Sequence, residues 1–312
     1  MKTNRILRTM TLTGLVLAFS VPLLLTGWGA QAEEGIQKMG PDISALQAKA
    51  EKGDPDAQCA LGIMFAKGGA PKDQAEAVRW YRKAAEQGHA KGQYLLGYIL
   101  ALGRGVRPDS AEALRWVRKS AEQGYSYAEL EFGLMCVMGD NNVPKDATEG
   151  LARIRKAAEQ GNVQAQASLA HFLHTGQGVP KDRAEALKWY RKAAEQAWAP
   201  TQCTFAKMFA DGDGVPKDLA EARQWYRKAA DQGDSQAQLN LGMMFADGMG
   251  VPTNTVNAYM WFDLAAARGL RDAVTNRARM ESQMTPDEIA EAKRLSAQFV
   301  PRKIPPPPDA PW

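Results

Sequence analysis

Two histidines, His171 and His174, stand three residues apart in the segment AHFLHTG and would share one face of a helix. Histidine is a common zinc ligand, but a zinc site takes three or four ligands, so this pair alone does not specify one. The fingerprints G-x-S-x-G, H-E-x-x-H, and the Walker and dinucleotide loops are absent after residue 32. The sequence therefore predicts no catalytic residue, no metal site and no cofactor.

The three cysteines, Cys59, Cys136 and Cys203, are the other candidates for chemistry. None has a nearby histidine in the sequence that would suggest a cysteine nucleophile. Their positions in the internal repeat place them on well-separated helices, whereas a disulfide needs α-carbons within about 7 Å. We therefore expect three buried, reduced thiols that behave as small hydrophobic residues.

An internal repeat is the strongest pattern in the chain. A phrase of the KAAEQG type returns at spacings of 36, 37, 36, 36 and 36 residues, ending at Gly88, Gly124, Gly161, Ala197, Gly233 and Gly269. Repeats of this length predict a stack of similar structural elements rather than a closed globule. A residue that recurs from repeat to repeat, such as Trp116 or Glu122, is then explained by architecture rather than by ligand binding or catalysis.

Each repeat predicts two helices. In the first helix a large residue is followed by a small one, as at Leu96 and Gly97, so that the partner helix packs closely. A glycine fifteen residues into the repeat suits a helix end with positive φ. The GVPKD stretch then supplies a proline as a helix starter and an aspartate, such as Asp182, near the next N-terminus. The second helix buries a stripe that includes Tyr190.

These residues carry a resemblance to a known family. The segment DSQAQLNLGMMFADGMGVP, together with second helices of the AEALKWYRKAAEQG type, resembles the Sel1-like repeat, a relative of the tetratricopeptide repeat. The resemblance implies an all-α fold, a right-handed α/α superhelical solenoid of six two-helix repeats with the first helices on its concave side. The third repeat departs from the pattern, with an extra residue in GDNNVPKD and with Arg153-Ile154 in place of Trp-Tyr. We expect the superhelix to bend or loosen there.

The two ends of the chain are distinct from the repeats. Residues 1–32 combine a basic start, an apolar core and a small-x-small site ending at Ala32, which is typical of a cleaved signal peptide. Their apolar core is shorter than the roughly 20 residues of a membrane span, so we expect no stable span after cleavage. The predicted organisation is: 1–32 signal peptide; 33–53 linker and capping helix; repeats at 54–88, 89–124, 125–161, 162–197, 198–233 and 234–269; 270–300 capping helices, with a capping box at Thr285 and Glu288; 301–312 proline-rich tail.

The net charge gives no reason to expect nucleic acid as a partner. The full chain carries +4, and loss of Lys2, Arg5 and Arg8 with the signal peptide leaves 4 − 3 = +1. A nearly neutral surface lacks the excess of basic residues that drives binding to phosphates.

One face of the first helices varies between repeats and is the predicted binding groove. Positions 3, 7, 10 and 14 after each repeat glycine project from one side of the helix. In repeats two and three they are mostly apolar or aromatic, and polar residues follow in repeats four and five. The predicted groove residues are Lys91, Leu95, Tyr98, Leu102, Tyr127, Glu131, Leu134, Met138, His171 and Lys207. The alternative is that some of these side chains pack between adjacent repeats.

These observations favour an exported, non-enzymatic scaffold, periplasmic or secreted, that binds a protein or peptide partner in the bacterial cell envelope. An alternative, which rests on the resemblance, is a host-interaction factor whose partner is a glycan or glycoprotein. A β-lactamase-like hydrolase is a third reading. The family branch linked with that activity carries a disulfide in each repeat, whereas this chain has three cysteines in all.

Overall fold

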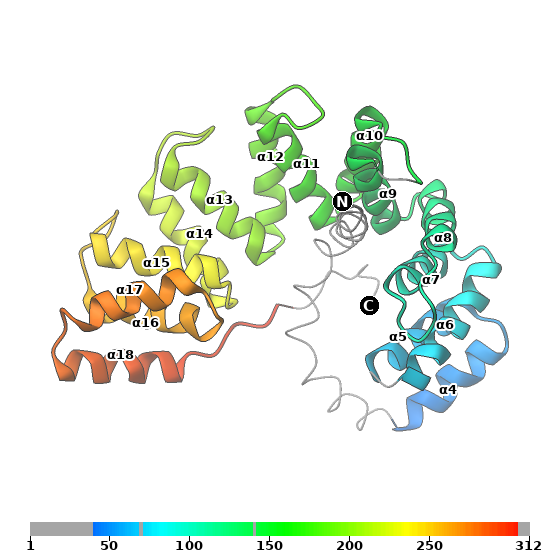
Figure 1. Ribbon diagram of the computed structural model, residues 1–312, viewed down its shortest axis with the longest axis horizontal. Helices are drawn as coiled ribbons and strands as arrows, with labels where there is room; N and C mark the ends of the chain where they lie inside the picture. Colours follow the sequence, from blue (N-terminus) through cyan, green and yellow to red (C-terminus); the bar gives the residue numbers. More distant parts are fainter. Residues whose placement is uncertain (1–39, 69–70, 140–141, 305–312) are drawn as a thin grey trace, which may run out of the picture. The chain divides into compact units, whose positions relative to one another are not determined.

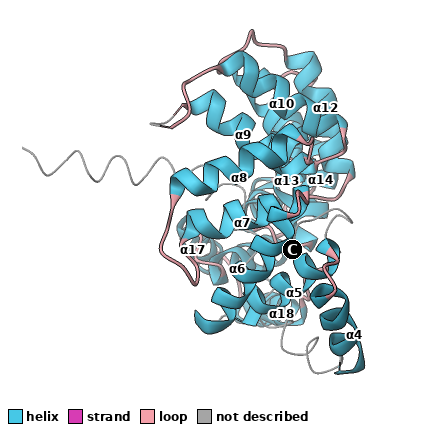
Figure 2. Ribbon diagram, turned by 90° about the vertical axis from the view of Figure 1, so that its right-hand side faces the viewer, coloured by secondary structure: helices cyan, strands magenta, loops and turns pink. Residues whose placement is uncertain are grey.

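The computed structural model describes residues 40–68, 71–139 and 142–304. This part of the chain forms fifteen α-helices and no strand (Figures 1 and 2). The predicted signal peptide and most of the proline-rich tail lie outside the described residues. No helix within the described ranges is long and apolar enough to cross a membrane.

The helices fall into two compact units that divide between Leu169 and Ala170, inside α11 (Val163–Thr175). The first compact unit contains α4 (Gly40–Glu51), α5 (Pro55–Gly68), α6 (Pro71–Glu86), α7 (Ala90–Leu102), α8 (Ser110–Glu122), α9 (Ser126–Met138) and α10 (Ala147–Glu159). The second contains α12 (Arg183–Glu195), α13 (Ala199–Asp211), α14 (Leu219–Asp231), α15 (Ser235–Asp247), α16 (Thr255–Ala267), α17 (Arg271–Glu281) and α18 (Pro286–Gln298).

Packing follows chain order within each unit. In the first unit α5 packs on α6, α7 on α8 and α9 on α10, and the second helices α6 and α8 also contact α7 and α9, the first helices of the next repeats. In the second unit α13 and α15 pair with α14 and α16 in the same way, and α17 and α18 close the array against α16. This succession of helix pairs confirms the all-α repeat fold predicted from the sequence.

Aspartate is the N-cap of α8, α10, α12 and α14, as predicted, whereas α6 begins at its proline, Pro71. Asp182 and Asp218 are N-caps in extended backbone, and their carboxylates accept the N–H groups of Glu185 and Glu221. The proline of GVPKD lies two residues before the cap, outside the helix, so its predicted role as first helical residue is wrong in these repeats. The reason is that the N-cap aspartate must precede the first helical residue.

Close packing explains the small residue of each first helix. A Cβ added at Gly97 would lie 2.8 Å from Val117 Cγ2 and 2.9 Å from the Ala113 carbonyl oxygen, both on α8. A second glycine of each repeat follows the end of the first helix. Its backbone is left-handed, with φ of +65° at Gly103 and +75° at Gly212, as is common where a helix ends in glycine.

A buried glutamine, the fifth residue of every repeat except the third, joins consecutive repeats. Its amide nitrogen donates to a carbonyl near the end of the preceding helix, at 3.0–3.3 Å: Gln58 to Ala50, Gln93 to Ala85, Gln166 to Ala158, Gln202 to Ala194 and Gln238 to Ala230. In three repeats its oxygen also accepts from the glutamine of the KAAEQG phrase, at 2.7–2.8 Å: Gln87 to Gln58, Gln123 to Gln93 and Gln232 to Gln202. The repeated glutamines therefore form one hydrogen-bond pattern.

The C-terminal helix begins as the sequence predicts. Thr285 and Glu288 form a capping box, in which the Thr285 side chain accepts the Glu288 N–H and the Glu288 carboxylate accepts the Thr285 N–H. Both ends of the reciprocal pair are satisfied, which stabilises the start of α18.

Replacing Gly97 with alanine tests the close approach of α7 and α8. In an open helix this change stabilises by about 1 kcal/mol through helix propensity. Here the Ala113 backbone leaves no room, so we expect the free energy of unfolding to fall by about 1–3 kcal/mol. Chemical denaturation followed by circular dichroism measures the change, and a rise in stability would contradict this account of the packing.

Candidate functional site

Four tyrosine side chains of the first compact unit gather between α7 and α9. Tyr94 and Tyr98 lie on α7, Tyr125 is the N-cap of α9, and Tyr127 lies in its first turn. The ring centroid of Tyr94 is 5.5 Å from that of Tyr125, 6.1 Å from that of Tyr127 and 6.4 Å from that of Tyr98. We call these four residues the tyrosine cluster.

The tyrosine cluster is partly open to solvent. Tyr94 and Tyr127 are buried, whereas Tyr98 and Tyr125 are half-buried and form its accessible part. Burial raises the pKa of Tyr98 to about 12, and burial also raises the pKa of Tyr94. The hydroxyl groups of Tyr94 and Tyr98 are therefore neutral at physiological pH.

Glu131 places a carboxylate beside these rings. It follows Tyr127 by four residues on α9, so both side chains lie on the same face of the helix. The side chain is buried, with 2% of its surface exposed. Its charge contributes, after burial, to the raised pKa of Tyr94. The cluster thus combines aromatic rings with a buried carboxyl group.

Of the predicted groove residues, the structure brings Tyr98, Tyr127 and Glu131 together. Leu95 is buried with 3% exposure in the hydrophobic core, so it packs between helices as the alternative interpretation expected. The remaining groove residues of repeats two and three stay nearer the surface: Lys91 and Leu134 are half-buried, and Leu102 and Met138 are exposed.

The two predicted groove residues of repeats four and five belong to the second compact unit. The exposed His171 meets the ring of Phe172 edge-on at 6.0 Å, and burial, followed by the charge of His174, lowers its pKa. Lys207 forms an ion pair with Asp211 one turn along α13. His174 Nε2 lies 3.0 Å from Asp213 Oδ2. The described residues contain no group of three or more side chains that could hold a metal ion.

Tyr94 and Tyr125 were missed by the sequence reasoning because they lie outside the four helix positions that it considered. Tyr94 is the sixth residue of its repeat and Tyr125 the first. A signal was nevertheless present, since four of the chain's eight tyrosines fall within residues 94–127. That local density marks the second and third repeats as unusual.

The sequence also missed a cysteine–histidine contact. Cys59 Sγ lies 3.4 Å from His89 Nδ1, and His89 Nε2 lies 3.2 Å from Asp56 Oδ1. The two partners are 30 residues apart, and stacking of one repeat on the next brings them together. Cys59 thus has a histidine neighbour in space although none lies near it in the sequence.

The same repeat positions form an equivalent contact elsewhere, between Cys203 and the N-cap Asp234. His89 is likewise an N-cap, and its Nδ1 accepts the Gly92 N–H at 3.3 Å. Burial raises the pKa of the Cys59 thiol to about 12, which is the opposite of what a nucleophile needs. The contact therefore belongs to the architecture of the repeat.

Thiol labelling at neutral pH tests this conclusion. Because burial keeps the thiols protonated, we expect iodoacetamide to leave the folded chain unmodified and to label all three cysteines once the chain is unfolded. Mass spectrometry counts the adducts. Fast labelling of Cys59 in the folded chain, abolished by His89→Ala, would show instead that His89 activates it.

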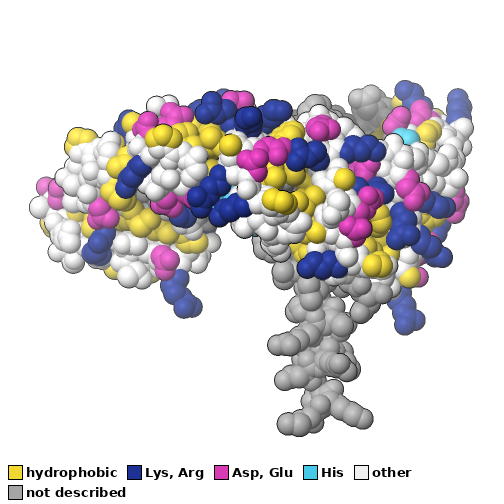
Figure 3. Space-filling view, turned by 90° about the horizontal axis from the view of Figure 1, so that it is seen from above, with side chains coloured by type: hydrophobic (Ala, Val, Ile, Leu, Met, Phe, Trp, Pro, Cys, Tyr) yellow, Lys and Arg dark blue, Asp and Glu magenta, His cyan; other side chains and the backbone are white. Residues whose placement is uncertain are grey.

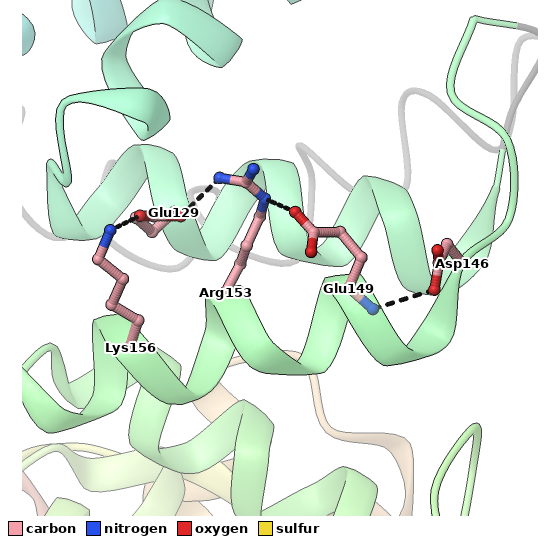
Figure 4. A network of polar contacts seen from close by, with 5 residues as sticks. All are labelled: Glu129, Asp146, Glu149, Arg153 and Lys156. Atoms are coloured by element: carbon pink, nitrogen blue, oxygen red, sulfur yellow. Dashed lines mark hydrogen bonds and ion pairs between the residues drawn. The ribbon is translucent and has the colours of Figure 1, made fainter.

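The third repeat replaces the buried glutamine with Glu129, and cations from the next helix surround it (Figure 4). Glu129 is 1% exposed, and its two oxygens lie 2.5 Å from Lys156 Nζ and 3.0 Å from Arg153 Nη1. Arg153 Nε also donates to Glu149 Oε1 at 2.6 Å. These contacts tie α9 to α10, whereas the sequence led us to expect loosening in this repeat.

Arg153 takes over the hydrogen bond that tryptophan makes in other repeats. Trp189 Nε1 donates to Glu185, four residues earlier, and Arg153 Nε donates to Glu149 at the same spacing. The guanidinium of Arg153 also lies 4.9 Å from the centre of the Phe132 ring. Arginine thus keeps both the polar contact and a contact with an aromatic ring.

Replacing the residues of this network with those of the other repeats tests whether their contributions to stability are coupled. We expect Glu129→Gln alone to destabilise the fold by about 1–3 kcal/mol, because two cations lose their buried acceptor. The triple variant Glu129→Gln, Arg153→Trp, Ile154→Tyr restores the pattern of the other repeats and should recover most of that loss. Denaturant unfolding measures both, and equal stability of the chain and the single variant would refute the coupling.

Charges elsewhere on the surface are mixed in sign. Figure 3 shows acidic and basic side chains interspersed over the visible face, without one continuous basic region. Several ion pairs join residues one helical turn apart, such as Arg227 with Asp231 and Arg294 with Glu291. This pattern suits solvated helix faces rather than an electrostatic site for nucleic acid.

Stacked helix pairs, repeat glycines and a variable aromatic face define an α/α repeat protein. The Sel1 repeat family matches residues 55–89, 90–125, 126–162, 163–197, 206–234 and 235–270, so the chain belongs to that family. Such repeats are commonly scaffolds for protein interaction and typically not enzymes.

Two solved structures are similar to this chain. A Sel1 repeat protein from Oxalobacter formigenes is 33% identical with a TM-score of 0.63, over 75% of this chain and 96% of that one. A protective antigen present in uropathogenic Escherichia coli strains, which displays an SLR fold, is 32% identical with a TM-score of 0.51. That match covers 82% of this chain and 63% of the antigen, so this chain spans less than two thirds of the antigen's length. No curated protein matches the chain.

Proposed function

We propose that this chain is an exported, non-enzymatic scaffold that binds a segment of a partner protein in the bacterial cell envelope. The binding surface consists of the tyrosine cluster together with Leu102 and Met138. The observation that carries the proposal is the gathering of four tyrosines on neighbouring first helices, with the rings of Tyr98 and Tyr125 accessible.

Tyrosine suits such a surface for physical reasons. Its ring offers a large contact area at a small cost in conformational entropy, and its hydroxyl forms hydrogen bonds at the edge of a contact. Leu102 follows Tyr98 by four residues on α7, and Met138 follows Leu134 by four on α9, so both extend the surface along their helices. Each leaves 37% of its surface exposed.

Export is supported by the sequence of residues 1–32, with its basic start, apolar core and cleavage site. The likeness to a protective antigen present in uropathogenic Escherichia coli strains favours the second candidate, a host-interaction factor that binds a glycan or glycoprotein. Sugar-binding sites use exposed tryptophan, whereas Trp189 and Trp225 are buried beneath Lys192 and Lys228, which favours a protein partner.

Substitution of the exposed apolar pair tests the proposed surface. We expect Leu102→Asp with Met138→Asp to abolish co-purification of a partner from envelope extract, because each adds a charge to the centre of an apolar contact. Met249→Asp is the matched control, since Met249 is equally exposed at 37% and lies after α15 in the second compact unit.

Circular dichroism must first show that all three proteins melt alike. A partner that the unmodified chain and the control retain, and that the double variant loses, supports the proposal. The same set of partners on all three proteins would place the binding site elsewhere.

A further inference from the structure

An extended segment follows the last helix and lies against α14 and α16 of the second compact unit. Residues 299–304, which we call the C-terminal strap, are not helical, and the backbone of Phe299 is extended, with φ of −69° and ψ of 122°. The ring centre of Phe299 lies 5.7 Å from that of Trp261 on α16. The N–H of Arg302 donates to the Asp231 carbonyl oxygen of α14 at 2.6 Å. The strap, which Figure 1 draws in red where it leaves α18, thus contacts two neighbouring second helices.

The side chains of the strap alternate in their exposure to solvent. Phe299 and Pro301 are half-buried, whereas Val300 leaves 80% of its surface exposed and Arg302 is exposed. An extended chain turns successive side chains to opposite sides, so the aromatic residue and the proline lie on the same side. Pro301 also restricts Val300 to extended backbone, which fixes this alternation in advance. The strap therefore presents an aromatic residue and, two positions later, a proline to the helices.

The site beneath the strap offers groups that an extended peptide uses. Asp231 is the last residue of α14, and the carbonyl groups at a helix C-terminus have no partner within the helix. Arg227 connects the two halves of the site. Its Nε donates to Asp231 Oδ1 at 2.7 Å, and its guanidinium lies 5.1 Å from the Trp261 ring centre. An aromatic ring and a backbone acceptor are thus held side by side.

The sixth repeat differs from the others at its tryptophan ring. In four other repeats a lysine three residues after the tryptophan lies 3.7–4.7 Å from the ring centre: Lys83, Lys119, Lys192 and Lys228. Leu264 stands at this position in the sixth repeat, and Phe299 of the strap packs edge-on to the ring of Trp261. Because no lysine of α16 lies over this ring, a side chain from outside the helix packs there.

We propose that this site binds an extended segment of a partner protein with an aromatic residue two positions before a proline. The strap fills the site in cis until the partner segment displaces it. A backbone hydrogen bond and a pair of rings attach the strap to α14 and α16, after the last helix, where local opening costs little free energy. The site lies on second helices of the second compact unit, so it is distinct from the tyrosine cluster.

The chemistry of the site defines the sequence that it accepts. The aromatic residue provides the ring that packs against Trp261. Proline is restricted to extended backbone, so a segment that contains it loses less conformational entropy on binding. The residue after the proline must keep its N–H, because this group donates to the Asp231 carbonyl oxygen. Grooves lined by aromatic rings bind proline-containing segments for the same physical reasons.

A fluorescein-labelled peptide with the sequence of residues 298–304, QFVPRKI, tests the proposal on the full chain. Fluorescence anisotropy gives its dissociation constant. In the unmodified chain the strap competes with the peptide, so the apparent affinity is reduced to the fraction of molecules in which the site is open. We expect Phe299→Ala, which removes the ring that contacts Trp261, to bind the peptide about tenfold more tightly than the unmodified chain does.

A second variant opens the site by another route, in case Phe299→Ala disturbs folding. Arg302→Pro removes the N–H donor at an exposed side chain, and we expect it to bind the peptide about threefold more tightly than the unmodified chain does. Val300→Ala is the matched control, because Val300 lies between the two contacts and is exposed to solvent. It should bind the peptide as the unmodified chain does.

A modified peptide tests the backbone contact. N-methylarginine in place of the peptide's arginine removes the N–H that donates to Asp231, so we expect it to bind the Phe299→Ala chain about three- to tenfold more weakly. Equal binding of the two peptides would show that they occupy a different site and would overturn the proposal.

Two further results would overturn the proposal. If the peptide binds the unmodified chain and both opening variants equally, or binds none of them, the strap is a fixed part of the fold. If light scattering shows a dimer of the unmodified chain that Phe299→Ala abolishes, a second copy and not a partner protein supplies the segment. The surface formed by the tyrosine cluster, Leu102 and Met138 is tested by other variants, so the two proposals fail separately.

Discussion

The structure depends on a buried amide that links five of the six repeats to the helix before them. A glutamine inside the first helix donates to a carbonyl of the preceding helix and, in three repeats, accepts from the glutamine that ends its own repeat. A buried amide without partners would cost several kcal/mol, so the two helices must keep one relative position. Small residues such as Gly97 allow the backbones to come close enough for this, and the left-handed glycines turn the chain back to begin the next helix.

The third repeat shows what happens when that amide is replaced. Glu129 cannot donate to a carbonyl, and a buried carboxylate requires cations. Arg153 replaces the tryptophan of the other repeats and supplies one cation, and Lys156 supplies the second. In four other repeats the lysine equivalent to Lys156 lies over a tryptophan ring. The three departures from the repeat are thus one coordinated change, and the helix pair stays connected by ion pairs instead of amide hydrogen bonds.

As a result of this change, the two faces of α9 carry different groups. The face toward α10 is filled by the chain's own arginine and lysine. The face toward α7 carries tyrosines and Glu131 and is partly open. The buried amides hold the repeats together, and the variable side chains lie on another face of the first helices. That face can bind a partner without a loss of stability. The proposed partner therefore binds where the repeats differ and not where they agree.

The sequence by itself determined the helix pairs, their order, their caps and the family, because these features follow from local periodicity and from residues that recur at fixed positions. It also identified Tyr98, Tyr127 and Glu131 as side chains of one face. Only the tertiary structure decided that Leu95 belongs to the core, that Tyr94 and Tyr125 join the cluster, and that His89 meets Cys59. The physical reason is that these contacts join successive repeats, and the way one repeat packs on the next sets which side chains are buried, whereas helical periodicity describes each helix alone.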